Sequence, residues 1–164
     1  MVIIHCTTKL LKRIGPAQPV SDSSSTTALG SWYATALFWR PQVALFVNEI
    51  TLLPLFVPLA PASTLVSRFV DGLAAELDVF HIPHSFIADE VEQMAEHKLA
   101  KTANRSVVGT MNEFEFLAEA HRDSGDELNL LRLSVDLAGT PCGPLRSRTG
   151  FPDRELQALV AGKA

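Results

Sequence analysis

The first third of the chain carries the hydrophobic pattern of β-strands. The β-branched run at 2–6 (VIIHC) predicts a first strand. In the next apolar run, at 31–39 (SWYATALFW), successive side chains fall on opposite faces of an extended strand. One face receives Trp32, Ala34, Ala36 and Phe38, and the other receives Tyr33, Thr35, Leu37 and Trp39. This second strand is therefore apolar on both faces.

Two polar turns follow this strand. Residues 40–42 (RPQ) reverse the chain into an apolar run at 43–47, and Asn48-Glu49 reverse it again into 52–57. We interpret Asn48-Glu49 as a hairpin turn rather than an active site, because the sequence fixes no second carboxylate or histidine near Glu49. Together the three runs predict an antiparallel meander.

A small sheet that is apolar on both faces needs cover on both sides. We expect helices from the C-terminal half on one face and a second copy of the chain on the other, which makes the protein a homodimer. Tryptophan and tyrosine contribute large contact areas at such interfaces. The expected interface residues are Trp32, Tyr33 and Trp39.

Helical patterns dominate from residue 62 onward. Apolar spacings of three and four residues, bounded by capping and stop residues, predict helices at 7–14, 62–80, 83–97, 111–121, 127–139 and 152–162. The segment 97–102 (HKLAKT) fits a short additional strand. The pattern at 127–138 fits a strand as well as a helix, and the stop at Ala138-Gly139 favours the helix.

Helices thus follow a hairpin-rich sheet rather than alternating with strands. This order predicts the α+β class: a mostly antiparallel sheet, made of the N-terminal strand and the meander, covered by several helices from the C-terminal half. With 164 residues and 47% hydrophobic content, we expect a single globular domain over 1–164. The Ser/Thr/Pro-rich stretch at 17–30 has no periodicity and predicts a flexible loop.

The overall charge argues against general nucleic-acid binding. The net charge is −4, whereas nucleic-acid binders need a basic surface. Residues 59–125 hold five basic and eleven acidic side chains, which we assign to solvent-exposed helix faces. A nucleic-acid regulator that uses Lys9, Lys12, Arg13 and Arg105 is therefore the least favoured interpretation.

Cysteine and histidine content gives no sign of a metal or a cofactor. Cys6 and Cys142 cannot form a disulfide framework, which indicates a reducing compartment, and we expect a cytoplasmic protein. His81 and His84 flank a proline at a helix junction and do not share a helical face, so we expect no metal site and no cofactor. The apolar run at 43–60 is interrupted by polar residues and prolines, so we expect no membrane span.

The segment 101–116 (KTANRSVVGTMNEFEF) is the most informative part of the chain. Thr110 and Glu113 fit a capping box, in which the hydroxyl and the carboxylate satisfy the first amides of a helix. Gly109 just before them allows a sharp entry. We therefore expect a strand, a tight loop and then a helix that begins after Gly109.

The same segment suggests an anion site. A helix N-terminus exposes N–H donors and partial positive charge, and Lys101 and Arg105 flank the predicted one. The candidate residues for an anionic ligand are Lys101, Thr102, Asn104, Arg105, Ser106 and Asn112. The alternative is a purely structural turn, in which Asn104 and Ser106 bond the loop's own backbone and Arg105 pairs with Glu113.

Four stretches together resemble an uncharacterised family of short bacterial proteins. They are VIIHCTTKLLKRI, GSWYATAL, LFVNEITLLPLFVPL and KTANRSVVGTMNEFEFL. The family motifs are M-I-I-x-C-T-K-K-L, W-[HY]-A, F-V-N-[ED]-x-T-L and K-T-x-N-R-S-V-x-G-[ST]-M-N-[DE]. The resemblance covers roughly residues 1–120, with Thr8 in place of a frequent lysine and an apparent insertion at 17–30.

What this resemblance implies is limited. The family is a domain of unknown function, so it implies a bacterial cytosolic protein and no particular activity. Small proteins of this kind are common in the gene pools of mobile elements, which suggests cargo of such an element.

We expect a binding or interaction module whose 101–112 loop contacts an anion or a protein partner. The alternative is a small enzyme acting on a phosphorylated or carboxylated metabolite. In that case Arg105 and the helix terminus hold the anion, and Glu49, Glu113 or a histidine is the base. The residue pattern alone leaves the choice between binding and catalysis open.

Overall fold

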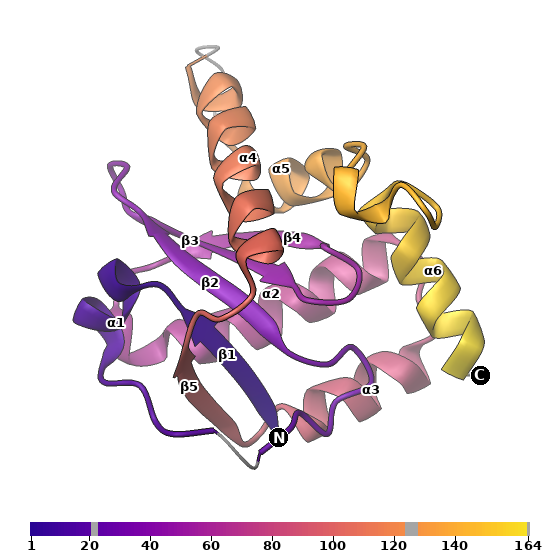
Figure 1. Ribbon diagram of the computed structural model, residues 1–164, viewed down its shortest axis with the longest axis horizontal. Helices are drawn as coiled ribbons and strands as arrows, with labels where there is room; N and C mark the ends of the chain where they lie inside the picture. The colour runs from indigo at the N-terminus through magenta and orange to yellow at the C-terminus, as the bar shows by residue number, and fades with distance from the viewer. Residues whose placement is uncertain (21–22, 124–127, 164) are drawn as a thin grey trace.

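A five-stranded sheet forms the centre of the computed structural model, which describes residues 1–20, 23–123 and 128–163 (Figure 1). The strands are β1 (Val2–Cys6), β2 (Trp32–Leu37), β3 (Val43–Asn48), β4 (Pro54–Pro58) and β5 (His97–Lys101). Their order in the sheet is β4-β3-β2-β1-β5. The β2-β3-β4 meander is antiparallel, as predicted, whereas β1 pairs in parallel with both β2 and β5.

Helices surround this sheet in the described part of the chain. They are α1 (Thr8–Ile14), α2 (Leu65–Val79), α3 (His84–Gln93), α4 (Arg105–Arg122), α5 (Leu130–Leu137) and α6 (Pro152–Lys163), with short 3-10 turns at Ala62–Thr64 and Gly143–Leu145. The α+β class is therefore confirmed. The helical interpretation of 127–138 is confirmed over α5, while residue 127 lies outside the described residues.

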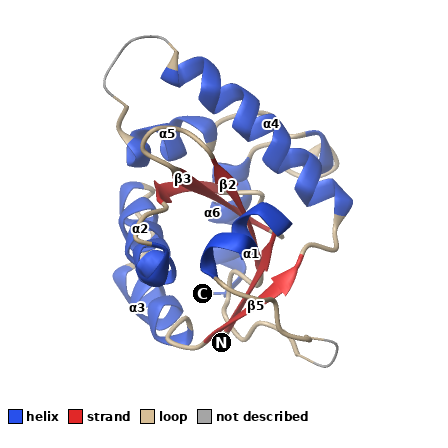
Figure 2. Cartoon of the chain, turned by 90° about the vertical axis from the view of Figure 1, so that its left-hand side faces the viewer, coloured by secondary structure: helices blue, strands red, loops and turns tan. Residues whose placement is uncertain are grey.

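Each face of the sheet packs against its own set of helices. Figure 2 shows α2 and α3 on one side of the strands and α4 and α5 on the other. The first core joins Trp32, Ala34 and Phe46 of the sheet to Phe69 and Leu73 of α2. The second joins Tyr33, Leu45 and Phe56 to Met111 and Phe114 of α4. The alternation of faces along β2 follows the sequence prediction.

Because both faces are covered by the chain's own helices, the predicted aromatic interface was wrong. Trp32 and Tyr33 are at most 1% exposed and Trp39 is 6% exposed. The ring of Trp32 meets Phe69 edge to face at 5.2 Å, and the Arg122 guanidinium lies 4.9 Å from the Trp39 ring. These aromatic residues belong to the interior of one chain, not to a surface for a partner.

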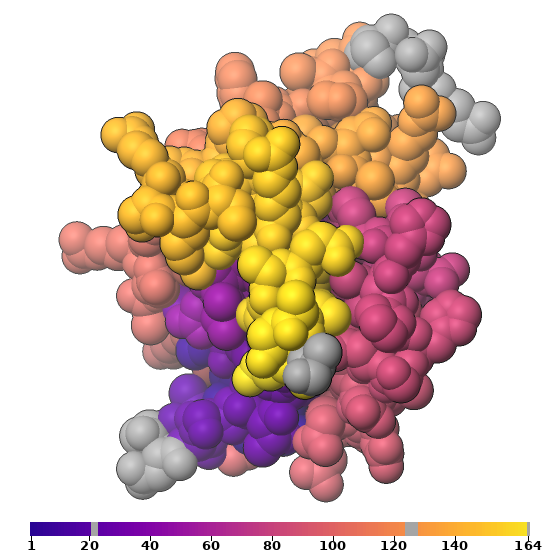
Figure 3. All heavy atoms as spheres, turned by 90° about the vertical axis from the view of Figure 1, so that its right-hand side faces the viewer, coloured from indigo at the N-terminus to yellow at the C-terminus, as the bar shows by residue number. Residues whose placement is uncertain are grey.

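Helix α6 closes the first core from the C-terminal end of the chain. Leu156 and Val160 join that core, and Gln157 Nε2 donates to the backbone oxygen of Phe80 at 2.8 Å. In the space-filling view α6 lies against the layer formed by α2 and α3 (Figure 3). Pro152 stands at the first turn of this helix, as the sequence predicts.

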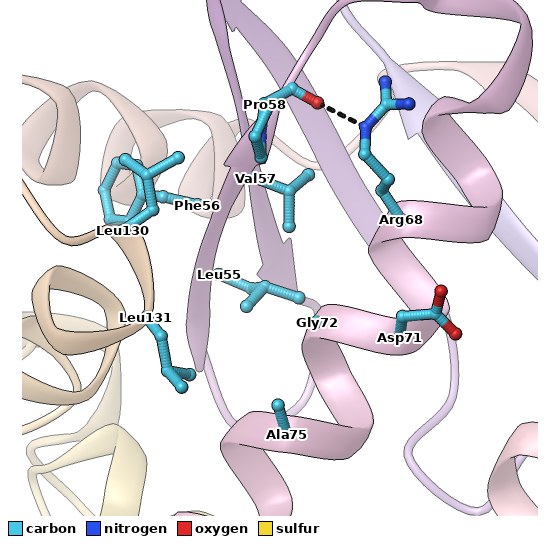
Figure 4. Close-up of a pocket in the computed structure, with 10 residues that line it drawn as sticks. All are labelled: Leu55, Phe56, Val57, Pro58, Arg68, Asp71, Gly72, Ala75, Leu130 and Leu131. Carbon is cyan, nitrogen blue, oxygen red and sulfur yellow. Dashed lines mark hydrogen bonds between the residues drawn. The ribbon is translucent and has the colours of Figure 1, made fainter.

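The outer edge of the sheet at β4 is protected against further strand pairing. Phe56 N donates outward to Ser134 Oγ of α5 at 2.8 Å. Residues two apart in a strand share their orientation, so Pro54 and Pro58 also face outward, and proline has no N–H to offer. Arg68 Nε donates to the Pro58 oxygen at 2.9 Å (Figure 4). This edge therefore presents almost no free backbone donor.

A small apolar groove of about 230 Å³ remains beside this edge, between α2, β4 and α5 (Figure 4). Gly72 of α2 lets the helix approach the strand closely, because a Cβ there would lie 2.9 Å from Val57 Cγ1. The Arg68 guanidinium lies at one end of the groove. It donates hydrogen bonds to the backbone oxygens of Pro58, Leu59 and Pro61 and to Thr64 Oγ1.

The turn at Asn48 organises the opposite end of the meander. The Asn48 side chain is fully buried, and its Oδ1 accepts from Thr51 N at 2.9 Å and from Ile50 N at 3.0 Å. Its Nδ2 donates to the Leu29 oxygen at 2.8 Å. Both polar atoms of the Asn48 side-chain amide are thus used inside the protein, as in a structural turn.

The same region anchors the end of the segment predicted to be a flexible loop at 17–30. The Glu90 carboxylate of α3 accepts from Ala28 N at 2.9 Å and from Leu29 N at 3.2 Å. Leu29 is fully buried. Ser21 and Asp22, in the middle of the segment, lie outside the described residues.

A buried carboxyl group without a partner lies on α2. Glu76 is fully buried, and neither of its carboxylate oxygens has a hydrogen-bond partner. Burial in an apolar environment raises the pKa of Glu76 well above its ordinary value, because the charged form loses its hydration. Stability linked to this group is therefore full below the unfolded-state pKa of roughly 4.3 and is lost as the pH rises through the folded-state pKa.

We predict that Glu76→Gln removes this loss of stability with rising pH. Denaturant unfolding between about pH 4 and 8 is expected to show a flatter stability profile for the variant, which becomes more stable than the wild type toward the alkaline end. Glu155→Gln is the matched control. Burial raises the Glu155 pKa, but Thr149 and the Arg148 cation outweigh it and lower the pKa overall, so this variant should lose stability at neutral pH. Parallel profiles for Glu76→Gln and the wild type would contradict the prediction.

Candidate functional site

The motif at 101–116 forms the corner where β5 ends and α4 begins. Lys101 is the last residue of the strand and Asn104 caps the helix. The Asn104 Oδ1 accepts from Ser106 N at 2.9 Å and from Val107 N at 3.3 Å. A side-chain oxygen at this position satisfies amides that have no partner within the helix. The helix therefore begins at Arg105.

The predicted helix start after Gly109 was wrong by about one and a half turns. Thr110 lies inside α4, where its Oγ1 donates back to the Ser106 oxygen at 3.1 Å, so it does not cap. Val107 and Met111 on this first part of the helix are buried in the second core. Packing of these apolar residues, together with the Asn104 cap, outweighs the weak helix propensity of the intervening residues.

The side chains of Tyr33 and His5, which both belong to the sheet, hold the corner in place. The Tyr33 hydroxyl of β2 accepts from Asn104 N at 2.9 Å. His5 of β1 stacks on the Tyr33 ring with centroids 4.7 Å apart, and its Nδ1 donates to the Lys101 oxygen at 2.9 Å. Burial raises the Tyr33 pKa more than the Asn104 N–H lowers it, so the phenol stays protonated.

Sequence reasoning missed this support, because His5, Tyr33 and Asn104 lie far apart along the chain. The parallel pairing of β1 places His5 opposite Tyr33 on one side and opposite Ala100 on the other. Only knowledge of that pairing would have connected the three segments.

The side chains on the outside of the corner surround an open hollow of about 420 Å³. Its lining residues are Thr102, Ala103, Asn104, Arg105, Val108, Gly109 and Asn112. Lys101 and Ser106 are exposed beside it. The structure thus brings four of the six predicted site residues to one hollow and leaves two at its border.

Most of these polar side chains have no partner among the described residues. The structural-turn alternative predicted backbone bonds from both Asn104 and Ser106 and an ion pair between Arg105 and Glu113. Among the described residues only Asn104 uses its side chain in this way. The side chains of Lys101, Thr102, Arg105, Ser106 and Asn112 make no hydrogen bond or ion pair within residues 1–20, 23–123 and 128–163.

A second hollow of about 400 Å³ continues along α4. It is lined by Asn112, Glu113, Phe116 and Leu117, so Asn112 borders both hollows. The Phe116 side chain is 73% exposed. The exposure of this residue could have been predicted from the sequence, because Phe116 does not fall on the apolar stripe of Phe114, Leu117 and Ala118.

Other candidate residues are dispersed. His84 lies 3.0 Å from Asp78, both exposed, and the described residues contain no group of three side chains suited to a metal ion. Burial raises the pKa of the Cys6 thiol to about 12 and that of Cys142 to about 11, so both thiols are protonated at neutral pH. No helix within the described ranges has the length and apolar character needed to cross a membrane.

Comparison with known proteins places the chain in a family. A family model described as a domain of unknown function (DUF6933) matches residues 3–155. The match confirms the resemblance to an uncharacterised family and extends it beyond residue 120. No curated protein and no solved structure shows a significant match to the chain.

We predict that Asn104→Ala destabilises the fold by about 0.5–2 kcal/mol in urea denaturation, because it removes the helix cap. Thr110→Val is the matched control, since it deletes only a hydroxyl that bonds within the helix. It should cost less than the Asn104 variant. A larger loss for Thr110→Val would restore the capping box as the start of the helix.

Proposed function

Because the chain belongs to a family whose domain has no known function (DUF6933), we propose its function from the β5–α4 corner alone: a binding module that recognises an anionic group through Arg105. The anionic group is a carboxylate or a phosphate carried by a small molecule or a protein partner. The exposed surface around the hollow at 102–112 is the binding surface.

One observation carries this proposal. Five polar side chains of the motif gather at one corner and bond to nothing in the described part of the chain, while Asn104, Tyr33 and His5 satisfy the turn. Polar residues that only shape a turn use their side chains on nearby backbone groups. Side chains that remain available around a hollow are suited to contact a ligand instead.

Charge supports an anionic ligand at this position. Arg105 is exposed and makes no ion pair within the described ranges, and its guanidinium can bind a carboxylate or phosphate through two parallel hydrogen bonds. The positive end of the α4 dipole adds to the attraction. Asn104 already occupies the amides of Ser106 and Val107, so side chains rather than helix N–H groups would make the main contacts.

The proposal also includes a cellular location and an origin for the protein. We place the protein in the bacterial cytoplasm as a small module, in keeping with its two free cysteines and the motif resemblance, and with carriage on a mobile element. Fractionation of the native host cells would test this location, and recovery of the protein outside the cytosolic fraction would contradict it.

We predict that Arg105→Ala abolishes anion binding without reducing stability. The probes are inorganic phosphate, sulfate, acetate and succinate, followed by thermal shift and by amide chemical shifts in NMR spectra. A probe at a hundredfold its Kd should stabilise the wild type by about 2.7 kcal/mol. Arg40→Ala is the control, because Arg40 is also exposed and makes no ion pair within the described ranges.

Shifts confined to the wild type and Arg40→Ala, centred on residues 102–112, are the expected result. Equal binding by Arg105→Ala, or no response of a monomeric wild type to any of the probes, would contradict the proposal.

Catalysis at the same corner is the second candidate function, and the orientation of the His5 ring favours it. Its Nδ1 donates to the Lys101 oxygen, so Nε2 is the ring nitrogen that a ligand at this corner would contact. If the protein is an enzyme, turnover of a phosphorylated or carboxylated metabolite should fall at least about a hundredfold in His5→Gln. Turnover that survives this variant would exclude His5 as the base.

A further inference from the structure

The exposed face of α4 carries a cation and a carboxylate at equal distances from a glycine. Arg105, Gly109 and Glu113 follow one another at intervals of four residues, so they lie in one row on successive turns. Helix α4 lies on the outside of the molecule in both ribbon views (Figures 1 and 2), and Arg105, Gly109 and Glu113 are all exposed on it. Neither charged side chain makes a hydrogen bond or an ion pair in the described part of the chain.

Neither the backbone conformation nor the space around position 109 requires a glycine in the isolated chain. Its φ is not positive, and a Cβ added there would meet no atom within 4 Å. Glycine inside a helix costs about 1 kcal/mol relative to alanine. A glycine on an exposed helix face does, however, allow a second helix to approach closely.

We propose that this face binds the same face of a second copy of the chain, with the two α4 helices antiparallel and crossing at Gly109. The inference rests on the proposed function and names the anion: it is the Glu113 carboxylate of the second copy. A twofold axis through the crossing brings Arg105 of each copy level with Glu113 of the other, because both lie four residues from the axis. The row at intervals of four residues suits the commonest helix-crossing class, at about −50°.

The two hollows fit this arrangement as well. Phe116 lies seven residues, about two helical turns, beyond Gly109, and the hollow beside Thr102 and Asn104 extends to the N-terminal end of α4, on the other side of Gly109. In the antiparallel pair the exposed Phe116 ring of one copy is therefore placed over the hollow beside Thr102 and Asn104 of the other. Each contact occurs twice, so two aromatic rings and two ion pairs surround the crossing.

The occupant is a second copy rather than an unrelated protein because the surface is complementary to itself. On the flank of the same helix, Glu115 is already engaged by Lys9 at 3.9 Å, and Lys9 also lies over Phe38 at 5.6 Å. Arg105 and Glu113, the charged side chains of the row at intervals of four residues, have no partner among the described residues and are of opposite sign.

Sedimentation equilibrium over a concentration series tests the pairing. The wild type is expected to form a dimer, and Arg105→Glu or Glu113→Arg should each raise its dissociation constant at least about tenfold, because each places like charges opposite each other twice. The double variant R105E/E113R should restore the dimer by exchanging the charges. Arg40→Glu and Asp71→Arg are controls that reverse exposed charges elsewhere and should leave the dimer unchanged. Phe116→Ser should weaken it.

The outcomes separate this inference from the proposed function. A monomeric wild type that still binds phosphate or acetate through Arg105 overturns only the inference. A monomer that binds no anion overturns both. A dimer that survives Arg105→Glu and Glu113→Arg, or that the double variant fails to restore, places the interface elsewhere and also overturns the inference. Circular dichroism melting of each variant verifies that the exposed substitutions leave the fold intact.

Discussion

The parallel insertion of β1 between β2 and β5 is the constraint on which the rest of the structure depends. Cys6 of β1 pairs with Ala34 on one side and with Lys101 on the other. This register fixes the position of the end of β5 relative to β2, on the far side of β1, and brings Asn104 within reach of the Tyr33 hydroxyl. The start of α4, and with it the placement of the motif side chains, follows from a strand formed by the first residues of the chain.

Local sequence patterns predicted what depends on local chemistry. The meander, the short strand at 97–101 and the helical stretches all followed from periodicity and turn residues. The pairing of β1 did not, because nothing in a short β-branched run specifies its neighbours. The start of α4 was also beyond reach, since Asn104 and Thr110 are both good capping residues and burial of Val107 decides between them.

The candidate site shows the same division. The sequence identified the correct segment, but it assigned the three aromatic residues Trp32, Tyr33 and Trp39 to a partner surface. Tyr33 instead supports the corner from inside. Asn48 and Arg105 make the contrast plain: the buried amide uses all of its hydrogen-bonding groups within the chain, whereas the exposed guanidinium uses none among the described residues. Polar satisfaction depends on tertiary position, so residue type alone cannot reveal it.

The prolines of β4 have a consequence for how copies of this protein can assemble. A sheet whose edge offers free N–H groups can grow from molecule to molecule into an open-ended fibre. Here Pro54 and Pro58 have no N–H on that side, and Ser134 takes the donor between them. Association at this edge cannot propagate through backbone pairing, so high local concentration in a cell would not convert this side of the sheet into a template for polymerisation.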